Sequence, residues 1–230
     1  PPIPHPERPP GRTTWHRSGE FMKYDRGGRD PNLDAAYAEM VRKHYAACVS
    51  YADAQVGRLT EKLRELTVGE RTVVVVWGDH GWHLGEHAVW GKHTLFEESL
   101  RSPLIIAGPG TSRSGCVVET VVETLDVFPT LCEMTGISIP DFTNGASLCA
   151  VMEDPQAKDH PAISYQSSAK AIRTSTHRMI LHNDGFVELY DHTAPEAETE
   201  NLTGRAMAPG DAALIAELTD LLHRRLANRK

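Results

Sequence analysis

The densest group of reactive side chains lies in residues 77–93, which read WGDHGWHLGEHAVWGKH. Asp79 and His80 are adjacent oxygen and nitrogen donors, and Gly78 and Gly81 on either side let the backbone turn tightly around an ion. Alone, an Asp-His pair more often serves as a turn cap beside an exposed imidazole. The concentration of polar groups around this pair favours a metal site instead.

The same loop contains one lysine. Lys92 lies between Gly91 and His93, and a lysine ammonium can hold phosphate or sulfate oxygens as a point charge. Most single lysines are only solvated, so this assignment depends on the neighbouring groups. Glu86 and His87 are also candidates for catalysis, but in a glycine-rich loop we favour a structural role in which they hold the loop by hydrogen bonds.

Two apolar runs bracket this loop. Residues 72–77 read TVVVVW and residues 103–107 read PLIIA, and both are predicted strands. An uninterrupted apolar strand is typical of a parallel sheet covered by helices on both faces. In open α/β sheets the ligand lies beyond the carboxyl ends of the strands, and Asp79 follows the first run at such an end.

Helices are predicted on both sides of these strands. From Pro31 to Leu66, apolar residues recur at three- and four-residue steps, which indicates one long amphipathic helix. Asp30, followed by Pro31, is the expected N-terminal cap of this helix. The pattern of residues 124–135 predicts a second helix that closes at Gly136.

The last third of the chain has the pattern of a small sheet with a helix. Short apolar segments between Ala162 and Tyr190 are separated by polar turns such as Asn183-Asp184-Gly185, which is typical of an antiparallel sheet. Residues 211–226 are amphipathic at helical spacing and are predicted to pack on that sheet. The whole pattern of helices and strands indicates an α/β fold class.

Composition excludes several classes of protein. The 230 residues are 40% hydrophobic and 24% charged, as in ordinary globular proteins and unlike disordered or fibrous ones. The formal charge of −7 offers no basic patch for nucleic acid, and no apolar run approaches the roughly 18 residues of a spanning helix. We therefore expect neither nucleic acid nor membrane as a partner.

The cysteines suggest no metal or redox motif. They are Cys48, Cys116, Cys132 and Cys149, and none belongs to a C-x-x-C pair. Cys48 and Cys132 occupy apolar helical positions, where we expect small buried side chains.

The reactive loop resembles a block of the iduronate-2-sulfatases. Residues 78–87, GDHGWHLGEH, followed by Trp90-Gly91-Lys92 and Pro103-Leu104-Ile105-Ile106, are similar to the D-H-G-W-x-L-G-E-H…W-x-K…P-L-I pattern of that branch. Residues 45–59 resemble the helix before the site in sulfatases generally. Residues 125–131 are similar to their D-x-x-P-T-L helix, and residues 188–202 to their C-terminal E-L-Y-D…N-L strand and turn. The resemblance spans most of residues 30–202.

The resemblance implies a type I sulfatase of the alkaline-phosphatase-like superfamily. The fold would be the C-terminal part of an alkaline-phosphatase-like sandwich with a small antiparallel-sheet-plus-helix C-terminal subdomain. It divides the chain into a loop entering the core (1–30), the C-terminal part of the catalytic domain (31–140) and a small α+β subdomain (141–230). The chain departs from the family at its C-terminal motif, where His192 and Ala194-Pro195 replace Leu and Asp-Pro.

The resemblance also implies roles for the loop residues. Asp79 and His80 match the pair that, with two N-terminal carboxylates, holds calcium, and Asp79 is the stronger ligand because a hard cation prefers carboxylate oxygen. His80 is either a secondary metal contact or a group that reaches a sulfate oxygen. Lys92 and His80 are the catalytic candidates, and Lys92 would contact the sulfate and the nucleophile. The expected substrate-binding residues are Lys92, Trp82, His83 and His93.

The family's nucleophile motif is missing from this chain. In the family a formylglycine is made from the Cys or Ser of C/S-x-P-x-R, and no cysteine here begins such a motif. The nearest pattern, Ser138-Ile139-Pro140-Asp141-Phe142, ends in Phe and follows a helix instead of opening one. The chain also opens on Pro1-Pro2-Ile3-Pro4 without Met. We therefore expect a C-terminal portion that is inactive alone and needs the N-terminal portion of the same enzyme as its partner.

The expected reaction is hydrolysis of a sulfate ester on a sugar, with a sulfated carbohydrate such as a glycosaminoglycan as substrate. The family implies an exported or lysosomal location. The alternative is a phosphodiester or phosphonate monoester hydrolase of the same superfamily, which an upstream Thr nucleophile would favour. A third hypothesis is a zinc-binding module made by His80, His83, His87 and His93, although their spacing matches no compact zinc site.

Overall fold

The structure, a computed structural model, describes residues 18–109, 111, 114–154, 157, 160–194, 198–204 and 208–229. Of the loop expected over residues 1–30, residues 1–17 therefore lie outside the described part. The chain divides into two compact units, the first reaching Pro109 and the second formed by the residues after it. The domain boundary expected at residue 140 stays a prediction.

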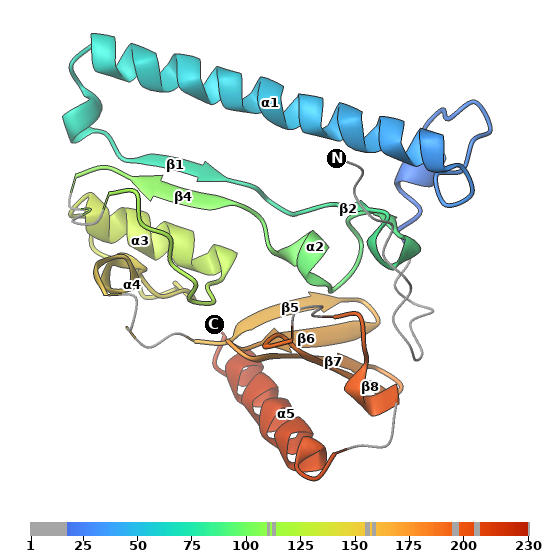
Figure 1. Cartoon of the computed structure of the whole chain (residues 1–230). Coiled ribbons are helices and arrows are strands. Elements are labelled where there is room, and N and C mark those ends of the chain that lie inside the picture. The colour runs from blue at the N-terminus through green and yellow to red at the C-terminus, as the bar shows by residue number, and fades with distance from the viewer. Residues whose placement is uncertain are drawn as a thin grey trace. The chain divides into compact units, whose positions relative to one another are not determined.

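The described part of the first unit contains one long helix, α1, and several short elements (Figure 1). In chain order they are η1 (Phe21–Lys23), α1 (Ala35–Glu65), η2 (Gly69–Arg71), β1 (Val74–Trp77), β2 (His83–Leu84), η3 (Glu86–Ala88), β3 (Trp90–Gly91), α2 (Glu97–Leu100) and β4 (Leu104–Ala107). The described part of the second unit contains η4 (Thr124–Asp126), α3 (Val127–Met134), α4 (Cys149–Glu153), β5 (Ala162–Gln166), β6 (Ala169–Arg173), β7 (His177–His182), β8 (Val187–Asp191), η5 (Leu202–Gly204) and α5 (Asp211–Ala227).

The long helix predicted from the apolar periodicity is present as α1, but its expected cap was wrong. Asp34 is the N-cap residue, and its carboxylate accepts a hydrogen bond from Tyr37 N at 2.9 Å. Asp30 instead accepts from Asn32 N at 2.8 Å, and its carbonyl oxygen accepts from Asp34 N at 2.9 Å. Asp30 therefore closes a separate turn before the helix, because a side-chain acceptor must lie within two or three residues of the free amide that it caps.

The two predicted cysteine positions differ in exposure. Cys132 in α3 is buried, as expected, whereas Cys48 on α1 is exposed, so that expectation was wrong. Only Tyr37, Ala38 and Arg42 of α1 are buried. Helical spacing predicts which residues share a face, but it does not say what covers that face.

The two strands that bracket the reactive loop form an antiparallel pair, so the expected parallel arrangement was wrong. Val74 pairs with Ala107 and Trp77 with Leu104, and β1 and β4 lie side by side in Figure 1. Parallel neighbours need a crossover connection that returns the chain to the starting end of the sheet. Here the chain turns back through residues 78–103, whose one α-helix, α2, has four residues.

The second unit is built on a four-stranded antiparallel sheet with the order β5-β6-β7-β8, as the sequence predicted. Helix α5 packs on this sheet (Figure 1). The core that they share consists of the buried side chains Ile163, Ile172, Met179, Leu189, Leu218 and Leu222. Burial of each such side chain stabilises the fold by about 2 kcal/mol relative to exposure. These elements and the first unit confirm the α/β class with a C-terminal antiparallel sheet and helix.

Helix α3 ends as predicted. Gly136 has a φ of +71°, a conformation that glycine adopts without strain. Its amide donates to Glu133 O at 3.1 Å, and the Ile137 amide donates to Cys132 O at 2.8 Å. This is the paired arrangement that satisfies the last carbonyl groups of a helix.

The C-terminal motif that departs from the family pattern is held by polar contacts. Asn201 Oδ1 accepts from Leu189 N at 3.1 Å, and Thr203 Oγ1 donates to Val187 O at 2.6 Å, so the turn after β8 is tied to the strand. His192 Nε2 lies 3.0 Å from Glu198 Oε1.

In the described residues, no helix combines the length and the apolar character that crossing a membrane requires.

Candidate active site

The reactive loop starts and ends at one hydrogen bond. Gly78 N, directly after β1, donates to Pro103 O, directly before β4, at 2.9 Å. Within the loop, β2 and β3 form a short antiparallel pair in which His83 faces Gly91. Gly81 N donates to Ser99 O at 2.8 Å, so the segment that follows Asp79 and His80 is fastened to α2. The loop therefore holds the predicted site residues on a defined backbone.

Asp79 and His80 lie at the end of β1 with their donor atoms close together. Asp79 Oδ1 is 3.7 Å from His80 Nε2, and the Asp79 side chain is 77% exposed. His80 Nδ1 lies 2.8 Å from Gly81 O, and since a carbonyl oxygen only accepts, Nδ1 must carry the proton and donate it. The other nitrogen, Nε2, is then a free electron-pair donor beside the carboxylate. Both side chains can serve as ligands for one cation.

Lys92 lies at the other end of the loop and is paired with an acidic residue that was not among the predicted site residues. Its Nζ is 3.4 Å from Glu20 Oε1. His93 Nδ1 is 3.6 Å from Glu20 Oε2 and 3.3 Å from Ser18 Oγ, while the rest of the His93 ring is open to solvent. In the described part of the chain, no hydrogen bond or ion pair joins Lys92 to Asp79 or His80.

His83 occupies the interior and not the surface. Its side chain is 0% exposed, and its Nε2 lies 2.7 Å from Thr94 Oγ1. A side chain without exposed surface cannot touch a dissolved substrate in this conformation, so the expected contact with sugar or sulfate is replaced by a structural role. Burial lowers the pKa of His83, against the opposing charge of Glu98.

Glu86 and His87 hold the loop together, as the sequence favoured. Glu86 Oε2 accepts from Leu84 N at 2.5 Å. The buried His87 ring stacks on Phe96 with ring centroids 4.1 Å apart, and His87 Nε2 is 3.7 Å from Glu98 Oε2. Although burial of Glu98 opposes ionisation, the neighbouring imidazoles of His87 and His83 lower its pKa.

The four histidines of the zinc hypothesis are scattered among different surroundings. His83 and His87 are packed against one another and against Phe96, and His93 faces Glu20. Across the described residues, no three of these four histidines bring their nitrogens within reach of a single ion. A structural zinc site needs four such donors, so this arrangement does not support a zinc module.

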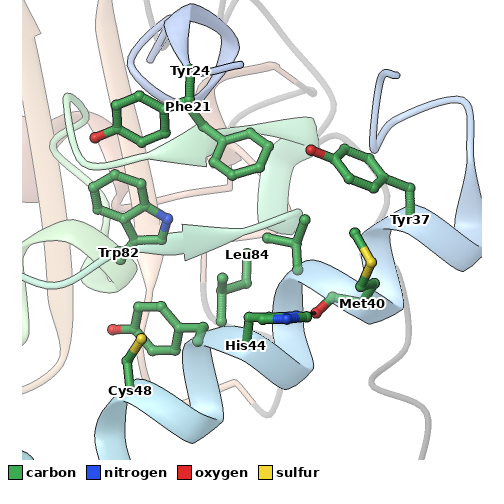
Figure 2. Close-up of a pocket in the computed structure, with 10 residues that line it drawn as sticks. Phe21, Tyr24, Tyr37, Met40, His44, Cys48, Trp82 and Leu84 are labelled. Atoms are coloured by element: carbon green, nitrogen blue, oxygen red, sulfur yellow. Dashed lines mark hydrogen bonds between the residues drawn. The ribbon is translucent and has the colours of Figure 1, made fainter. Parts of the chain in front are cut away.

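Trp82 lines a pocket of about 330 Å³ between the loop and α1. Figure 2 shows the rings of Phe21, Tyr24 and Trp82 on one side and the α1 side chains, including His44 and Cys48, on the other. The Trp82 ring centroid is 6.5 Å from that of His80. Aromatic faces beside a polar site suit a ligand that has a flat apolar face and a charged group.

The sequence reasoning missed Ser18, Glu20 and Glu98. Glu20 lies in a segment rich in Gly and Arg without periodicity, and nothing in that segment points to Lys92. Glu98 lies after the loop in the short helix α2, outside the motif that pointed to the site. The contacts of Ser18 and Glu20 join positions far apart in the chain, which a pattern of local spacing does not encode.

Comparisons with known proteins agree on one family. The family model "Sulfatase" matches residues 8–137, and the model "N-sulphoglucosamine sulphohydrolase, C-terminal" matches residues 85–228. A sulfatase from Formosa agariphila is 34% identical over 68% of this chain and 31% of its own length. Mouse iduronate 2-sulfatase is 30% identical over 45% of this chain and 23% of its own length. The chain spans about a third or less of these relatives.

Solved structures give the same result for the fold. The protein BT4656, solved in complex with its substrate D-glucosamine-2-N,6-O-disulfate, is 27% identical with a TM-score of 0.76, covering 92% of this chain and 46% of that one. The phosphonate monoester hydrolase of Agrobacterium radiobacter is 23% identical with a TM-score of 0.74, covering 86% of this chain and 43% of that one. These likenesses confirm the fold expected from the loop motif, that of the alkaline-phosphatase-like sulfatases.

Proposed function

The chain belongs to the sulfatase family, and on this premise we propose that it supplies the cation-binding and anion-binding groups for hydrolysis of a sulfate ester on a sugar. The observation that carries the proposal is the pair at the end of β1, where the Asp79 carboxylate and the free nitrogen of His80 lie 3.7 Å apart. Two donors at this separation can bind the same ion. Catalytic groups on a loop beyond a strand end are common in α/β enzymes.

Calcium is the proposed cation. The donor set fits in part, because the exposed Asp79 carboxylate is the hard oxygen donor that calcium prefers, and His80 is turned toward it by its hydrogen bond to Gly81 O. The carboxylates that complete the site would come from outside this chain. When bound, a divalent cation offsets negative charge on the oxygens of the ester.

Lys92 is proposed to bind the ester anion. Its ammonium group is a compact charge with three donors, and a fixed cation aimed at oxygens where negative charge builds up lowers the barrier of ester hydrolysis. The glycine before Lys92 has a φ of +133°, so a side chain there would be strained. The strand β3 thus presents Lys92 on a backbone path that depends on Gly91.

The sugar is proposed to lie against Trp82 and His93. Trp82 contributes an aromatic wall to the pocket of Figure 2, and a pyranose ring has an apolar face that packs on such a wall. The exposed His93 ring has a hydrogen-bonding edge for hydroxyl or sulfate oxygens. The resemblance of the loop to iduronate-2-sulfatases supports a 2-sulfated uronic acid as the first substrate to test.

The remainder of the enzyme is proposed to supply the nucleophile. The chain has no C/S-x-P-x-R motif, and it spans about a third of the Formosa sulfatase. We expect the chain alone to be inactive and to work with the N-terminal portion of the same protein. The likeness to the phosphonate monoester hydrolase is one of fold alone at 23% identity, so we advance no second function.

Replacement of Lys92 by Ala tests the proposal. In the enzyme that contains this chain and its catalytic remainder, Lys92→Ala should lower kcat for an aryl sulfate by roughly 10²- to 10³-fold, the usual cost of losing one charge-stabilising donor. Lys43→Ala is the matched control, since Lys43 is an exposed lysine on α1 that pairs with Glu39 on the same helix. Full activity of Lys92→Ala, or faster turnover of a phosphonate ester than of any sulfate ester, would overturn the assignment.

Asp79→Asn tests the cation separately. The amide keeps the shape of the side chain but removes the charge that a calcium ion requires. Chelation should abolish the activity of the unchanged enzyme, and added calcium should restore it. Asp79→Asn should need a much higher calcium concentration for half-maximal activity, whereas Asp25→Asn, at an exposed turn before α1, should not. Equal calcium requirements in the two variants would remove Asp79 from the site.

A further inference from the structure

We propose that Glu20 is an internal counter-anion for Lys92, a positioning residue that competes with the ester and with the sulfate product for the ammonium group. The proposal rests on the proposed role of Lys92 in anion binding. Glu20 lies in a segment before α1. Neither the loop motif nor the spacing of residues along the chain connects this segment with the site.

The carboxylate of Glu20 bridges two basic side chains of the reactive loop. Its Oε1 is 3.4 Å from Lys92 Nζ, and its Oε2 is 3.6 Å from His93 Nδ1. The side chains of Glu20 and Lys92 are 22% and 30% exposed, so solvent screens the pair only in part. Glu20 thus occupies the position beside the ammonium that an anionic group of a ligand must take.

The backbone holds Glu20 in this place. A Cβ added to Gly91 would lie 2.0 Å from Ser18 Oγ, which shows that the segment before Glu20 lies directly on β3. Phe21, the next residue, packs near Trp90 with ring centroids 5.9 Å apart. Ser18 and Phe21, which lie on either side of Glu20 in the chain, both contact β3, the strand that leads to Lys92. The Glu20 carboxylate therefore stays beside the Lys92 ammonium group without a tight ion pair.

The pair has the geometry of a replaceable contact. Charge-assisted hydrogen bonds between ammonium and carboxylate groups usually span about 2.7–2.9 Å, and the distance here is longer. Glu20 Oε2 is buried and has no hydrogen-bond partner in the described part of the chain, which is an unfavourable state for a charged oxygen. A sulfate group brings several oxygens that can serve Lys92 and His93 together, so it can displace Glu20. After hydrolysis, Glu20 would pair with Lys92 again and favour release of the product.

The test is inhibition by inorganic sulfate in the enzyme that carries this chain. Glu20→Gln keeps the shape of the side chain and removes its charge, so the inhibition constant for sulfate should fall roughly three- to ten-fold, as expected for loss of one competing partly screened charge. The KM for the sulfate ester should fall by a similar factor. Glu70→Gln, an equal change of charge at an exposed position of η2, should change neither constant.

A second variant separates competition from simple folding effects. Glu20→Asp keeps the charge but shortens the side chain by one methylene, so its inhibition constant should lie between those of the unchanged enzyme and Glu20→Gln. An unchanged or higher inhibition constant in Glu20→Gln, with the thermal unfolding midpoint preserved, would overturn the proposal. If Lys92→Ala abolishes activity while Glu20→Gln leaves sulfate affinity unchanged, only this inference fails. If Lys92→Ala stays fully active, the proposed function fails first.

Discussion

Asp126 and His160 form an ion pair within the second unit, with His160 Nε2 3.1 Å from Asp126 Oδ2 and the Asp126 side chain 0% exposed. The same carboxylate accepts from Glu123 N at 2.7 Å and from Ala146 N at 2.9 Å. Asp126 belongs to the D-x-x-P-T-L segment of the family resemblance. Its contacts show that this aspartate joins the start of α3 to two loops and has a structural role.

Removal of the Asp126 charge should destabilise the second unit. In Asp126→Asn, one oxygen still accepts a hydrogen bond, but His160 loses its ionic partner and the buried amide groups lose a charged acceptor. We expect a loss of about 3 kcal/mol in the free energy of unfolding, as for other broken buried pairs. Urea denaturation would measure it. The control Glu133→Gln, at an exposed position of α3, should change the value by less than about 0.5 kcal/mol, and equal losses in both variants would contradict this role.

The Asp126–His160 pair should make stability depend on pH in a defined window. The hydrogen bond to Asp126 raises the pKa of His160 above its ordinary value of 6.5. Burial of Asp126 opposes ionisation, but the hydrogen bonds from His160 and two amides outweigh it and lower the pKa of Asp126 below 3.8. The His160 contribution is therefore complete below pH 6.5 and is lost as the pH rises through the raised pKa. The Asp126 contribution is complete above pH 3.8 and is lost as the pH falls through the lowered pKa.

His160→Gln checks the basic side of this window. The unfolding free energy of the unchanged protein should exceed that of His160→Gln most strongly at pH 5 to 6, and the difference should shrink above pH 6.5. Denaturation series at several pH values would measure the difference. A constant difference from pH 5 to pH 9 would show that His160 contributes packing and no ionic stabilisation.

His83 should give the opposite pH dependence in the first unit. Thr94 Oγ1 donates its one proton to Ser99, so it accepts from His83 Nε2, and the buried Nδ1 has no hydrogen-bond partner among the described residues. Burial lowers the pKa of His83 below 6.5. The unfolded chain then binds more protons than the folded chain, so the contribution of His83 is complete above pH 6.5 and is lost as the pH falls through the lowered pKa.

A His83→Gln variant should therefore be less sensitive to acid than the unchanged protein, although it is less stable at pH 7.5. Hydrogen exchange of the amide groups in β2 and β3 would report on the stability of the first unit specifically, because these amides lie in the reactive loop. An equal loss of protection in both proteins between pH 7.5 and pH 5.5 would contradict the assignment of a buried neutral imidazole.

Gly81 should tolerate no side chain. A Cβ at this position would lie 2.1 Å from Glu98 O, a backbone atom, so either the loop or α2 must move. We expect Gly81→Ala to lower the free energy of unfolding by about 1–3 kcal/mol and to reduce activity with it. Gly57→Ala is the control, since Gly57 lies in α1 with nothing within 4 Å of an added Cβ, and it should raise stability by about 0.5–1 kcal/mol. A neutral Gly81→Ala would mean that the loop is not fastened to α2.

The sequence by itself determined the elements whose signals are local. Apolar periodicity identified α1 and α5, alternation and polar turns identified the sheet β5–β8, and a glycine closed α3. Asp79 and His80 could be proposed as a donor pair because they are neighbours in the chain, so any fold that ends a strand before them keeps them together. The family resemblance rested on the same loop and was sufficient for the fold and the family.

The tertiary structure decided which of these residues are accessible and which partners they have. His83 and His93 have the same side chain in the same loop, yet one is buried against Phe96 and the other faces solvent. The β1–β4 pairing is antiparallel, and Lys92 faces Glu20, because these contacts join segments that approach only in the folded chain. Burial and long-range pairing depend on the surrounding surfaces and charges, and the spacing of residues along the chain contains no record of them.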